Sequence, residues 1–462
     1  MLTLARCGLS IMALALLVGC DERPPLNAPL AQWDTDAGYR FSNLSGGDNS
    51  DSLLFVASFS GGGTRAASLA FGALQELARQ QSSWEGKTKR LIDELDVIYA
   101  VSGGTFTGGY YALHGDRIFQ DFESRFLRKD WDRELRSRIL WSPRNWLRLW
   151  SPYFGRTHIM AELLDEALFE GNTYGDLLRR RQRPFLIIHA TDMAMLSRFE
   201  FDQSKFDWLC SDLSQFPIAL TSAASAALPV VLSPISLKNY AGTCGFQVPT
   251  ATESALKRGG AAAQRAREYL SYLDVEKHAY IHLLDGGLSD NMALRSLIEA
   301  ANVAGGLENL LKFGRKFGLL NKVKKFVILA VDAETSPDVM TLGGDQIPSI
   351  FSAMSSLIHV PINRYSYETV GQMRALVERL RQELRTKPRA VDSPFAANVD
   401  MYFINASLAQ VGDPEERESL MKIPTTMYLT DAEVDRLLLI GGRLIQNDPD
   451  FQRLMRDIEA GK

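Results

Sequence analysis

Residues 53–66 read LLFVASFSGGGTRA, a short apolar run followed by three consecutive glycines. Two further stretches have the same form, LDVIYAVSGG at residues 95–104 and IHLLDGG at residues 281–287. Each run is rich in aliphatic and β-branched residues, which predicts a strand buried on both faces, and helical periodicity follows each glycine turn. A strand, a tight turn and a helix are therefore expected three times.

Ser102 lies at the apex of the second turn. A serine on such a turn is held away from its own strand with its hydroxyl exposed, and small neighbours are needed because larger side chains would clash across the bend. Gly103 and Gly104 meet this need on one side, and Ala100 meets it on the other. The pattern predicts an exposed nucleophile.

The other two turns carry groups that a serine nucleophile needs. Gly61, Gly62 and Gly63 have no Cβ atoms, so their amides can approach a ligand closely at the start of a helix whose dipole favours negative charge. This arrangement predicts an oxyanion hole. Asp285 ends a predicted strand before two glycines, which would present its carboxylate at the same sheet edge as Ser102. Together the turns predict an esterase site with Asp285 as the general base.

In this order the three motifs resemble the patatin-like phospholipase family, which uses a Ser-Asp dyad rather than a catalytic triad. The stretch TSAASAALP at residues 221–229 is similar to the small-residue helix and proline that the family carries between its elbow and its aspartate. Ser60, Ala66 and Ala100 depart from the family pattern, and none of them removes a catalytic group. The resemblance covers roughly residues 50–335.

The resemblance implies that Ser102 attacks fatty-acyl esters of phospholipids or lysophospholipids, that Asp285 takes its proton, and that an acyl-enzyme intermediate forms. Arg65 is a weaker candidate, as an anchor for a phosphate headgroup, and a helix-start residue that packs over the glycine loop is the alternative. No cofactor is required. Two alternatives stay open: a non-catalytic envelope lipoprotein that binds an anionic lipid or a protein partner, and an esterase of non-lipid substrates.

Alternating strands and helices predict an α/β fold with a mostly parallel sheet, and the resemblance implies a three-layer α/β/α arrangement with a helical insert. The site is expected at the carboxyl ends of the strands. Residues 239–267, rich in Gly, Ala and Thr, predict an insertion or mobile loop, and a last helix is expected from Thr430, with Glu433 placed for a capping box. The expected parts are a signal peptide (1–19), a tether (20–51), the catalytic domain (52–335) and a mainly helical extension packed on the core (336–462).

The N-terminus predicts the compartment. An apolar stretch from Gly8 to Val18 follows Arg6, is too short to span a bilayer as a lasting helix, and ends in LVGC at residues 17–20. This resembles a bacterial lipoprotein signal, and it implies lipidation of Cys20 and a chain anchored in the cell envelope that faces the periplasm. Asp21 favours the inner membrane. An ordinary cleaved signal peptide with an incidental cysteine is the alternative.

Cys7 would leave with the signal and Cys20 would be lipidated, so the mature fold would keep Cys210 and Cys244 of the four cysteines. Two thiols in an oxidising compartment are a disulfide candidate. Two unpaired buried cysteines are the alternative, because the Cα separation is not given by the sequence. No cysteine or histidine spacing indicates a metal site.

Composition narrows the classes of partner. The 462 residues are 46% hydrophobic and 23% charged, and the formal net charge of −4 argues against a nucleic-acid partner. The segment from Arg128 to Trp150 is unusual, because it carries seven basic side chains and four tryptophans. Tryptophan with arginine favours a bilayer interface, so this segment is a candidate contact with anionic lipid. Helices packed on the sheet with solvated basic faces, or a lid over the substrate, are the alternatives.

Overall fold

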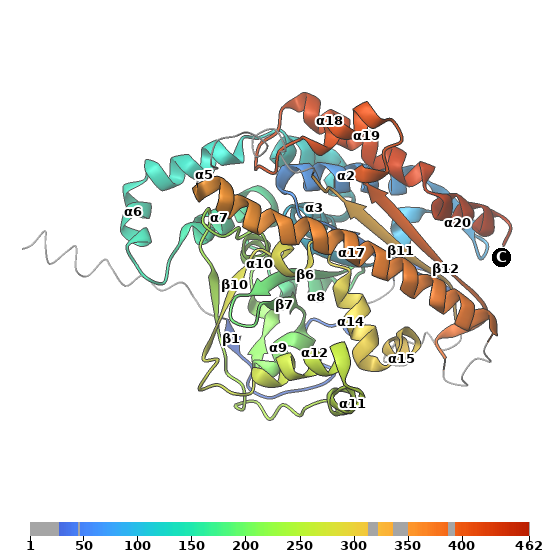
Figure 1. Ribbon diagram of the computed structural model, residues 1–462, viewed down its shortest axis with the longest axis horizontal. Helices are drawn as coiled ribbons and strands as arrows, with labels where there is room; N and C mark the ends of the chain where they lie inside the picture. The colour runs from blue at the N-terminus through green and yellow to red at the C-terminus, as the bar shows by residue number, and fades with distance from the viewer. Residues whose placement is uncertain (1–26, 45–46, 313–321, 336–349, 387–392, 462) are drawn as a thin grey trace, which may run out of the picture.

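The computed structural model describes residues 27–44, 47–312, 322–335, 350–386 and 393–461. The expected signal peptide, Cys20 and Asp21 lie outside these residues. Over the described ranges, one large sheet carries helices on both sides (Figure 1). No helix in those ranges is both long enough and apolar enough to cross a bilayer.

The central sheet has eight strands in the order β12-β11-β2-β5-β6-β10-β9, and β7 also pairs with β6. Strands β12, β11, β2, β5 and β6 run parallel, whereas β7, β9 and β10 pair antiparallel. The predicted three-layer fold with a mostly parallel sheet is confirmed. The strands are β1 (Ala28–Pro29), β2 (Leu53–Phe59), β3 (Gln81–Trp84), β4 (Lys87–Arg90), β5 (Leu95–Val101), β6 (Phe185–Asp192), β7 (Ser197–Phe201), β8 (Ser211–Asp212), β9 (Ile235–Lys238), β10 (Tyr280–Leu284), β11 (Val323–Asp332) and β12 (Phe395–Ser407).

Helices connect the strands and cover both faces of the sheet. They are α2 (Gly63–Arg79), α3 (Gly103–His114), α4 (Ile118–Phe122), α5 (Trp131–Leu140), α6 (Pro143–Leu149), α7 (Arg156–Leu164), α8 (Tyr174–Arg180), α9 (Gln203–Trp208), α10 (Ile218–Ser225), α11 (Thr250–Arg258), α12 (Gly260–Ser271), α13 (Gly287–Asp290), α14 (Arg295–Ala304), α15 (Leu307–Lys312), α17 (Ile350–Thr386), α18 (Pro414–Met421), α19 (Asp431–Asn447) and α20 (Pro449–Glu459).

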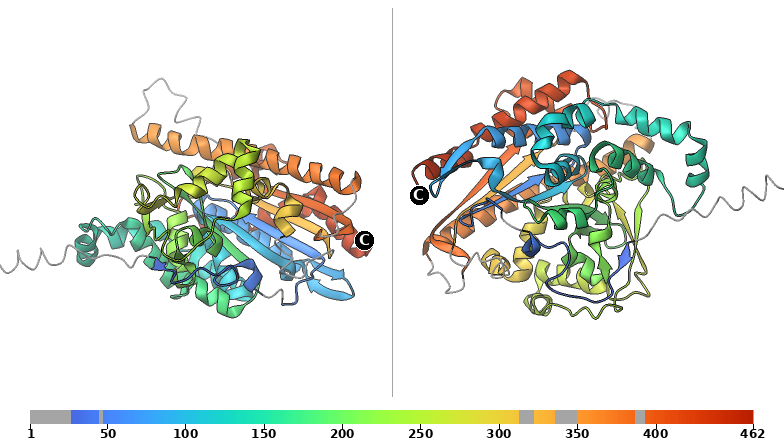
Figure 2. Two further views of the ribbon diagram at one scale, coloured as in Figure 1. Left: turned by 90° about the horizontal axis from the view of Figure 1, so that it is seen from below. Right: turned by 180° about the vertical axis from the view of Figure 1, so that it is seen from behind.

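Strand β2 shows how the apolar run specifies burial on both faces. Phe55, Ala57 and Phe59 belong to the larger core, which includes α2 and α3, whereas Leu54 and Val56 belong to a second core with α14 and α17. Successive side chains of a strand point to opposite faces, so a continuous apolar run fills both cores. Figure 2 shows α17 lying along one side of the sheet.

The C-terminal part of the chain is built into the sheet. Strand β12 pairs in parallel with β11, so the sheet continues past residue 335, where the predicted catalytic domain ends. Helix α19 packs against α2 so closely that a Cβ on Gly72 would lie 2.3 Å from the Leu438 carbonyl oxygen. Thr430 caps α19 and Glu433 completes the capping box, as the sequence predicts.

Residues 239–267 differ from the prediction of a loop. They include α11 and most of α12, which are separated at Gly259, where φ is +75°. Ala255, Ala262 and Ala266 form a small buried cluster between these helices. Alanine has the highest helix propensity, so a composition that looked loop-like forms two helices once its alanines have a surface to pack on.

The predicted tether is folded from Asn27 onward, which corrects its expected length. The Asn27 side chain donates to Ser211 Oγ at 2.8 Å, and the fully buried Tyr39 accepts a hydrogen bond from the Leu186 amide. The Cys210–Cys244 disulfide lies beside this segment, because the Trp33 amide donates to the Cys244 carbonyl oxygen at 2.9 Å. Aromatic residues thus attach this segment to the domain, although the segment is otherwise rich in turn-forming residues.

Candidate active site

Ser102 lies in the sharp turn between β5 and α3. Its φ of 47° and ψ of −122° are values that residues with a Cβ rarely adopt, as in a serine held on a strained strand-to-helix elbow. A Cβ on Gly103 would lie 2.0 Å from the Gly63 carbonyl oxygen, and one on Gly104 would lie 2.5 Å from that of Phe59. The elbow and the glycine loop (residues 61–63) therefore pack backbone to backbone.

Ser225, which the sequence analysis did not single out, supports the elbow from α10. The Ser102 amide donates to Ser225 Oγ at 2.7 Å, and the Ser225 hydroxyl donates to the His189 carbonyl oxygen at 2.5 Å. The hydroxyl thereby links the elbow to β6. Ser225 lies in the small-residue stretch at 221–229, but nothing in that pattern distinguishes it from Ser222.

Asp285 directly follows β10 and lies against Ser102. The Ser102 hydroxyl donates to Asp285 Oδ2 at 3.3 Å, across 183 positions of sequence. The Gly287 amide donates to Oδ1 at 2.7 Å, and the Asp285 amide donates to the Ala227 carbonyl oxygen at 3.0 Å. The structure thus brings together the two residues that the sequence predicts as nucleophile and base, and it fixes the carboxylate from its own turn.

Burial sets the protonation of this carboxyl group. It raises the pKa of Asp285 to about 7, and the hydrogen bonds from the Gly287 amide and Ser102 offset only part of that effect. Asp285 is 6% exposed and Ser102 is 8% exposed. A carboxylate with a pKa near neutrality can both accept and return a proton at physiological pH.

The glycine loop requires one correction. The Gly61 amide donates to the Asn291 carbonyl oxygen at 3.1 Å, so Gly61 is not available as the predicted oxyanion donor. Its lack of a side chain is needed for space, since a Cβ there would lie 2.4 Å from Asn291 Oδ1. The amides of Gly62 and Gly63 make no hydrogen bond to the described parts of the chain, and they stay predicted donors at the start of α2. The Gly103 amide, at the start of α3, directly follows Ser102 and is a further candidate donor.

Asn291 is a further residue of the site that the sequence analysis missed. Its side chain occupies the space beside both glycine turns, because a Cβ on Gly287 would lie 3.0 Å from Asn291 Oδ1. Its Nδ2 donates to Ser366 Oγ on α17 at 3.3 Å. Its position six residues after Asp285 was visible in the sequence, but its contact with Gly61, 230 positions earlier, was not.

Arg65 does not have the predicted role of headgroup anchor. The side chain is 2% exposed, and it donates to the carbonyl oxygens of Ala333 at 2.9 Å and Ile423 at 2.6 Å. Burial lowers the pKa of Arg65 to about 10, while the charge of Asp332 opposes that shift. Arg65 therefore ties the start of α2 to two C-terminal segments, and no part of its charge is free for a phosphate.

Two histidines lie in the strands near Asp285, His189 in β6 and His282 in β10. His189 is fully buried in β6, and this burial lowers the pKa of His189 to about 3. His282 Nδ1 lies 2.8 Å from Ser236 Oγ on the neighbouring strand. Neither ring has a hydrogen bond to Ser102 or Asp285 in the described structure. The site contains a serine and an aspartate without a histidine between them.

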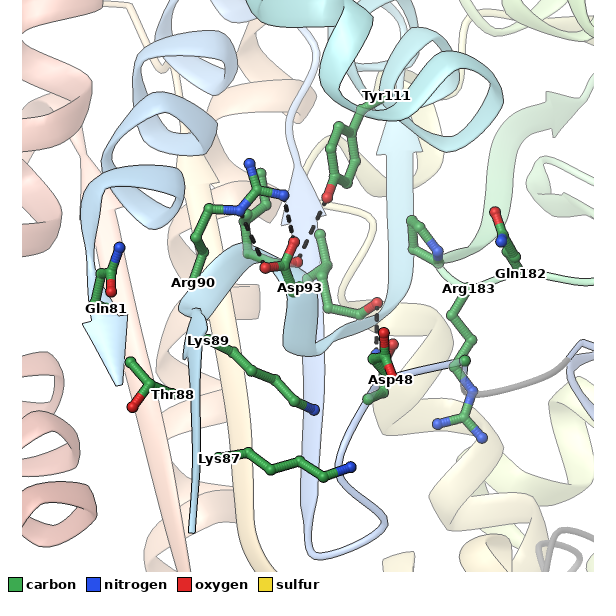
Figure 3. Close-up of a pocket in the computed structure, with 15 residues that line it drawn as sticks. Asp48, Gln81, Lys87, Thr88, Lys89, Arg90, Asp93, Tyr111, Gln182 and Arg183 are labelled. Carbon is green, nitrogen blue, oxygen red and sulfur yellow. Dashed lines mark hydrogen bonds and ion pairs between the residues drawn. The ribbon is translucent and has the colours of Figure 1, made fainter. Parts of the chain in front are cut away.

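Figure 3 shows a cavity of about 830 Å³, and Ser102 is not among the residues that line it. Leu95 at the start of β5 and Pro184 just before β6 line it, so it lies at the amino ends of the strands. Arg90 is bonded there to Asp93 and Asp116. The cavity is polar and both of its arginines are paired, since Arg183 lies 2.6 Å from Asp96, so it is not a pocket for an acyl chain.

The sequence matches the profile of the family described as patatin-like phospholipase over residues 57–298. This span covers more than half of the chain, and both Ser102 and Asp285 lie within it. The eight-stranded sheet and the matched span together define an α/β protein of the patatin-like class. The chain belongs to the patatin-like phospholipase family.

Solved structures give a more distant likeness. Human GIVD cytosolic phospholipase A2 is similar with 13% identity and a TM-score of 0.42, over 89% of this chain and 63% of that one. The same human enzyme in complex with methyl gamma-linolenyl fluorophosphonate gives 14% identity and a TM-score of 0.37, over 89% and 60% of the two chains. The chain thus spans about three fifths of these structures. No curated protein matches the sequence.

Proposed function

We propose that this chain is a membrane-anchored serine acyl hydrolase that cleaves fatty-acyl esters of phospholipids or lysophospholipids through a Ser102–Asp285 dyad. The observation that carries the proposal is the 3.3 Å contact between Ser102 Oγ, on a strained elbow, and Asp285 Oδ2. The open amides of Gly62 and Gly63 lie on the loop that packs against this elbow. Family membership supports lipid esters as the substrate class.

The reaction follows from this arrangement. Ser102 Oγ attacks the ester carbonyl carbon while Asp285 accepts the hydroxyl proton, and the alcohol leaves with that proton. The amides of Gly62, Gly63 and Gly103 stabilise the negative charge on the carbonyl oxygen, an effect of several kcal/mol at comparable sites. Water then attacks the acyl-serine ester with Asp285 again as base, and the fatty acid is released.

We further propose that a lipid on Cys20 holds the domain at the inner membrane, facing the periplasm. Six residues separate Cys20 from the folded Asn27, so the chain between them spans at most about 25 Å. This short span would keep the domain close to the bilayer that supplies its substrate. The Cys210–Cys244 disulfide supports an oxidising compartment.

A panel of substrates tests the activity. The purified chain is incubated with phospholipids, lysophospholipids, neutral glycerides and a soluble chromogenic ester, beside Ser102→Ala and Asp285→Asn. We expect fatty-acid release from the phospholipids or lysophospholipids, and a loss of about a hundredfold or more in each variant. Release that is equal in parent and variants would contradict the dyad, and cleavage of the soluble ester alone would contradict the substrate class.

Cell-based labelling tests the anchor. Cells that express the full chain are grown with a labelled fatty acid, and we expect label on the parent and none on Cys20→Ser. The parent should also float with the inner-membrane fraction. A parent that carries no label would refute lipidation at Cys20 and leave the question of catalysis untouched.

A further inference from the structure

Helices α5 and α6 form an arm, residues 131–150, that projects from the body of the molecule at one end (Figure 1). The arm exposes large apolar side chains: Trp141 is 78% exposed, Trp150 is 72% and Trp146 is 48%. Leu140 and Leu147 are exposed with them. A folded protein rarely presents three tryptophans to water on one short segment without a surface for them to bind.

The arm also carries positive charge that the rest of the protein does not neutralise. Arg133, Arg136 and Arg144 are exposed and have no ion pair with any residue that the structure describes. Other arginines of the arm behave differently. Arg138 pairs with Glu166 at 2.7 Å, and Arg148 pairs with Glu162. These paired arginines hold the arm against the body, which leaves the unpaired ones for an outside partner.

The arm joins the body at two ends, which we call its roots: the first at Asp132 and the second at Arg156. The first root contacts the segment that supports the glycine loop. Asp132 Oδ2 in α5 accepts a hydrogen bond from the Met427 amide at 3.2 Å. The neighbouring Thr426 carbonyl oxygen accepts from the Thr64 amide at 2.9 Å, directly after the loop. The arm therefore begins beside the proposed oxyanion donors.

The second root contacts the segment that supports Asp285. Arg156, which starts the next helix, donates to the Val230 carbonyl oxygen at 2.8 Å. Val230 and Val231 are half exposed, and a few residues earlier the Ala227 carbonyl oxygen accepts the Asp285 amide. Both roots thus lie at the edge of the sheet where Ser102 and Asp285 meet.

We infer that the α5–α6 arm docks into the interface of a bilayer that contains anionic phospholipid and presents the site to that surface. Tryptophan side chains settle at the level of the lipid headgroups, and unpaired arginines bind lipid phosphates. The unpaired arginines favour an anionic bilayer over a purely apolar protein surface as the binding partner. The inference rests on the proposed function for its purpose, because a lipid hydrolase needs its substrate delivered at the edge that holds Ser102.

Tryptophan fluorescence tests the docking directly. The full chain is added to vesicles of phosphatidylethanolamine and phosphatidylglycerol whose acyl chains carry bromine, which quenches tryptophan on contact. We expect emission to fall by about 40%, since the arm exposes three of the seven tryptophans. The variant Trp141→Ala/Trp146→Ala/Trp150→Ala should show almost no bromine-dependent quenching. A parent that is not quenched, or a variant quenched as strongly as the parent, would overturn the inference.

Charge variants test the lipid chemistry. Arg133→Gln/Arg136→Gln should weaken binding to the anionic vesicles at least severalfold, and replacing phosphatidylglycerol by phosphatidylcholine should do the same to the parent. Arg374→Gln/Arg379→Gln on α17 is the matched control, which removes the same charge from another exposed surface and should bind as the parent does. If both double variants lose the same amount of vesicle binding, the binding reflects the overall charge of the protein and not the arm, and the inference is overturned.

Rates separate this inference from the proposed function. We expect the ratio of vesicle hydrolysis to soluble-ester hydrolysis to fall at least tenfold in the tryptophan variant. Quenching without hydrolysis of any ester would refute the proposed activity and leave the docking surface standing. Hydrolysis with an unchanged ratio would refute the docking surface alone. A mass in solution twice that of one chain, lost in the tryptophan variant, would assign the arm to a second copy and also overturn the inference.

Discussion

At the scale of single residues, Asp285 determines how the proposed activity depends on pH. Burial raises the pKa of Asp285 to about 7, and only the deprotonated carboxylate can accept the Ser102 proton. We therefore expect kcat/KM on a soluble ester to rise about tenfold per pH unit below pH 7 and to level off above it. A pH–rate profile from pH 5 to 9 measures this, and a flat profile would contradict Asp285 as the base.

For single residues, the motifs predicted the positions of Ser102 and Asp285 but not the contacts of Gly61 and Arg65. The roles proposed for Ser102 and Asp285 came from turns that each follow a strand, because local backbone geometry decides where such a side chain points. The hydrogen bonds that occupy the Gly61 amide and the Arg65 side chain are made instead to Asn291 and Ile423, which lie hundreds of positions away. The motif does not show whether its arginine is exposed or buried, so the prediction of Arg65 as a headgroup anchor was wrong.

At the scale of elements, the contact between α2 and α19 holds the C-terminal region on the core. We expect Gly72→Ala to lower the free energy of unfolding by about 1–3 kcal/mol, because the added Cβ would lie 2.3 Å from the Leu438 carbonyl oxygen, and this clash outweighs the gain in helix propensity. Urea denaturation followed by circular dichroism measures the change.

Gly371→Ala on α17 is the matched control for this substitution. No atom of the residues that the structure describes lies within 4 Å of its added Cβ, so the same exchange should raise the free energy of unfolding by about 0.5–1 kcal/mol. Equal effects at the two positions would show that propensity alone acts and that α2 and α19 do not touch as the structure has them.

The periodicity of the sequence predicted most helices and strands, but it did not predict which strands pair in the sheet. The runs around Val56 and Ile98 were recognisable as buried strands, since both of their faces are apolar. The antiparallel β7, β9 and β10 and the addition of β12 to the sheet depend on pairing between distant segments. The two helices at 250–271 were missed, because alanine and glycine in mixture favour neither helix nor loop until packing decides.

At the scale of the whole molecule, the disulfide joins the segment after α9 to the segment after β9, beside the N-terminal residues that contact it through Trp33. Its cysteines are 34 positions apart, and closing a loop of that length stabilises a fold by about 3–4 kcal/mol. We expect Cys210→Ser/Cys244→Ser to lose that much free energy of unfolding and to become insensitive to a reductant. If reductant leaves the parent's unfolding curve unchanged, the disulfide does not contribute as described.

Covalent labelling of Ser102 tests the central claim most directly. The parent, Ser102→Ala and Asp285→Asn are incubated with an alkyl fluorophosphonate, which forms a stable tetrahedral adduct with an activated serine, and the peptides are mapped by mass spectrometry. The Ser102–Asp285 contact of 3.3 Å predicts an adduct on Ser102 in the parent, none in Ser102→Ala, and labelling at least about a hundredfold slower in Asp285→Asn. An adduct at another residue, or equal labelling in all three proteins, would contradict the dyad.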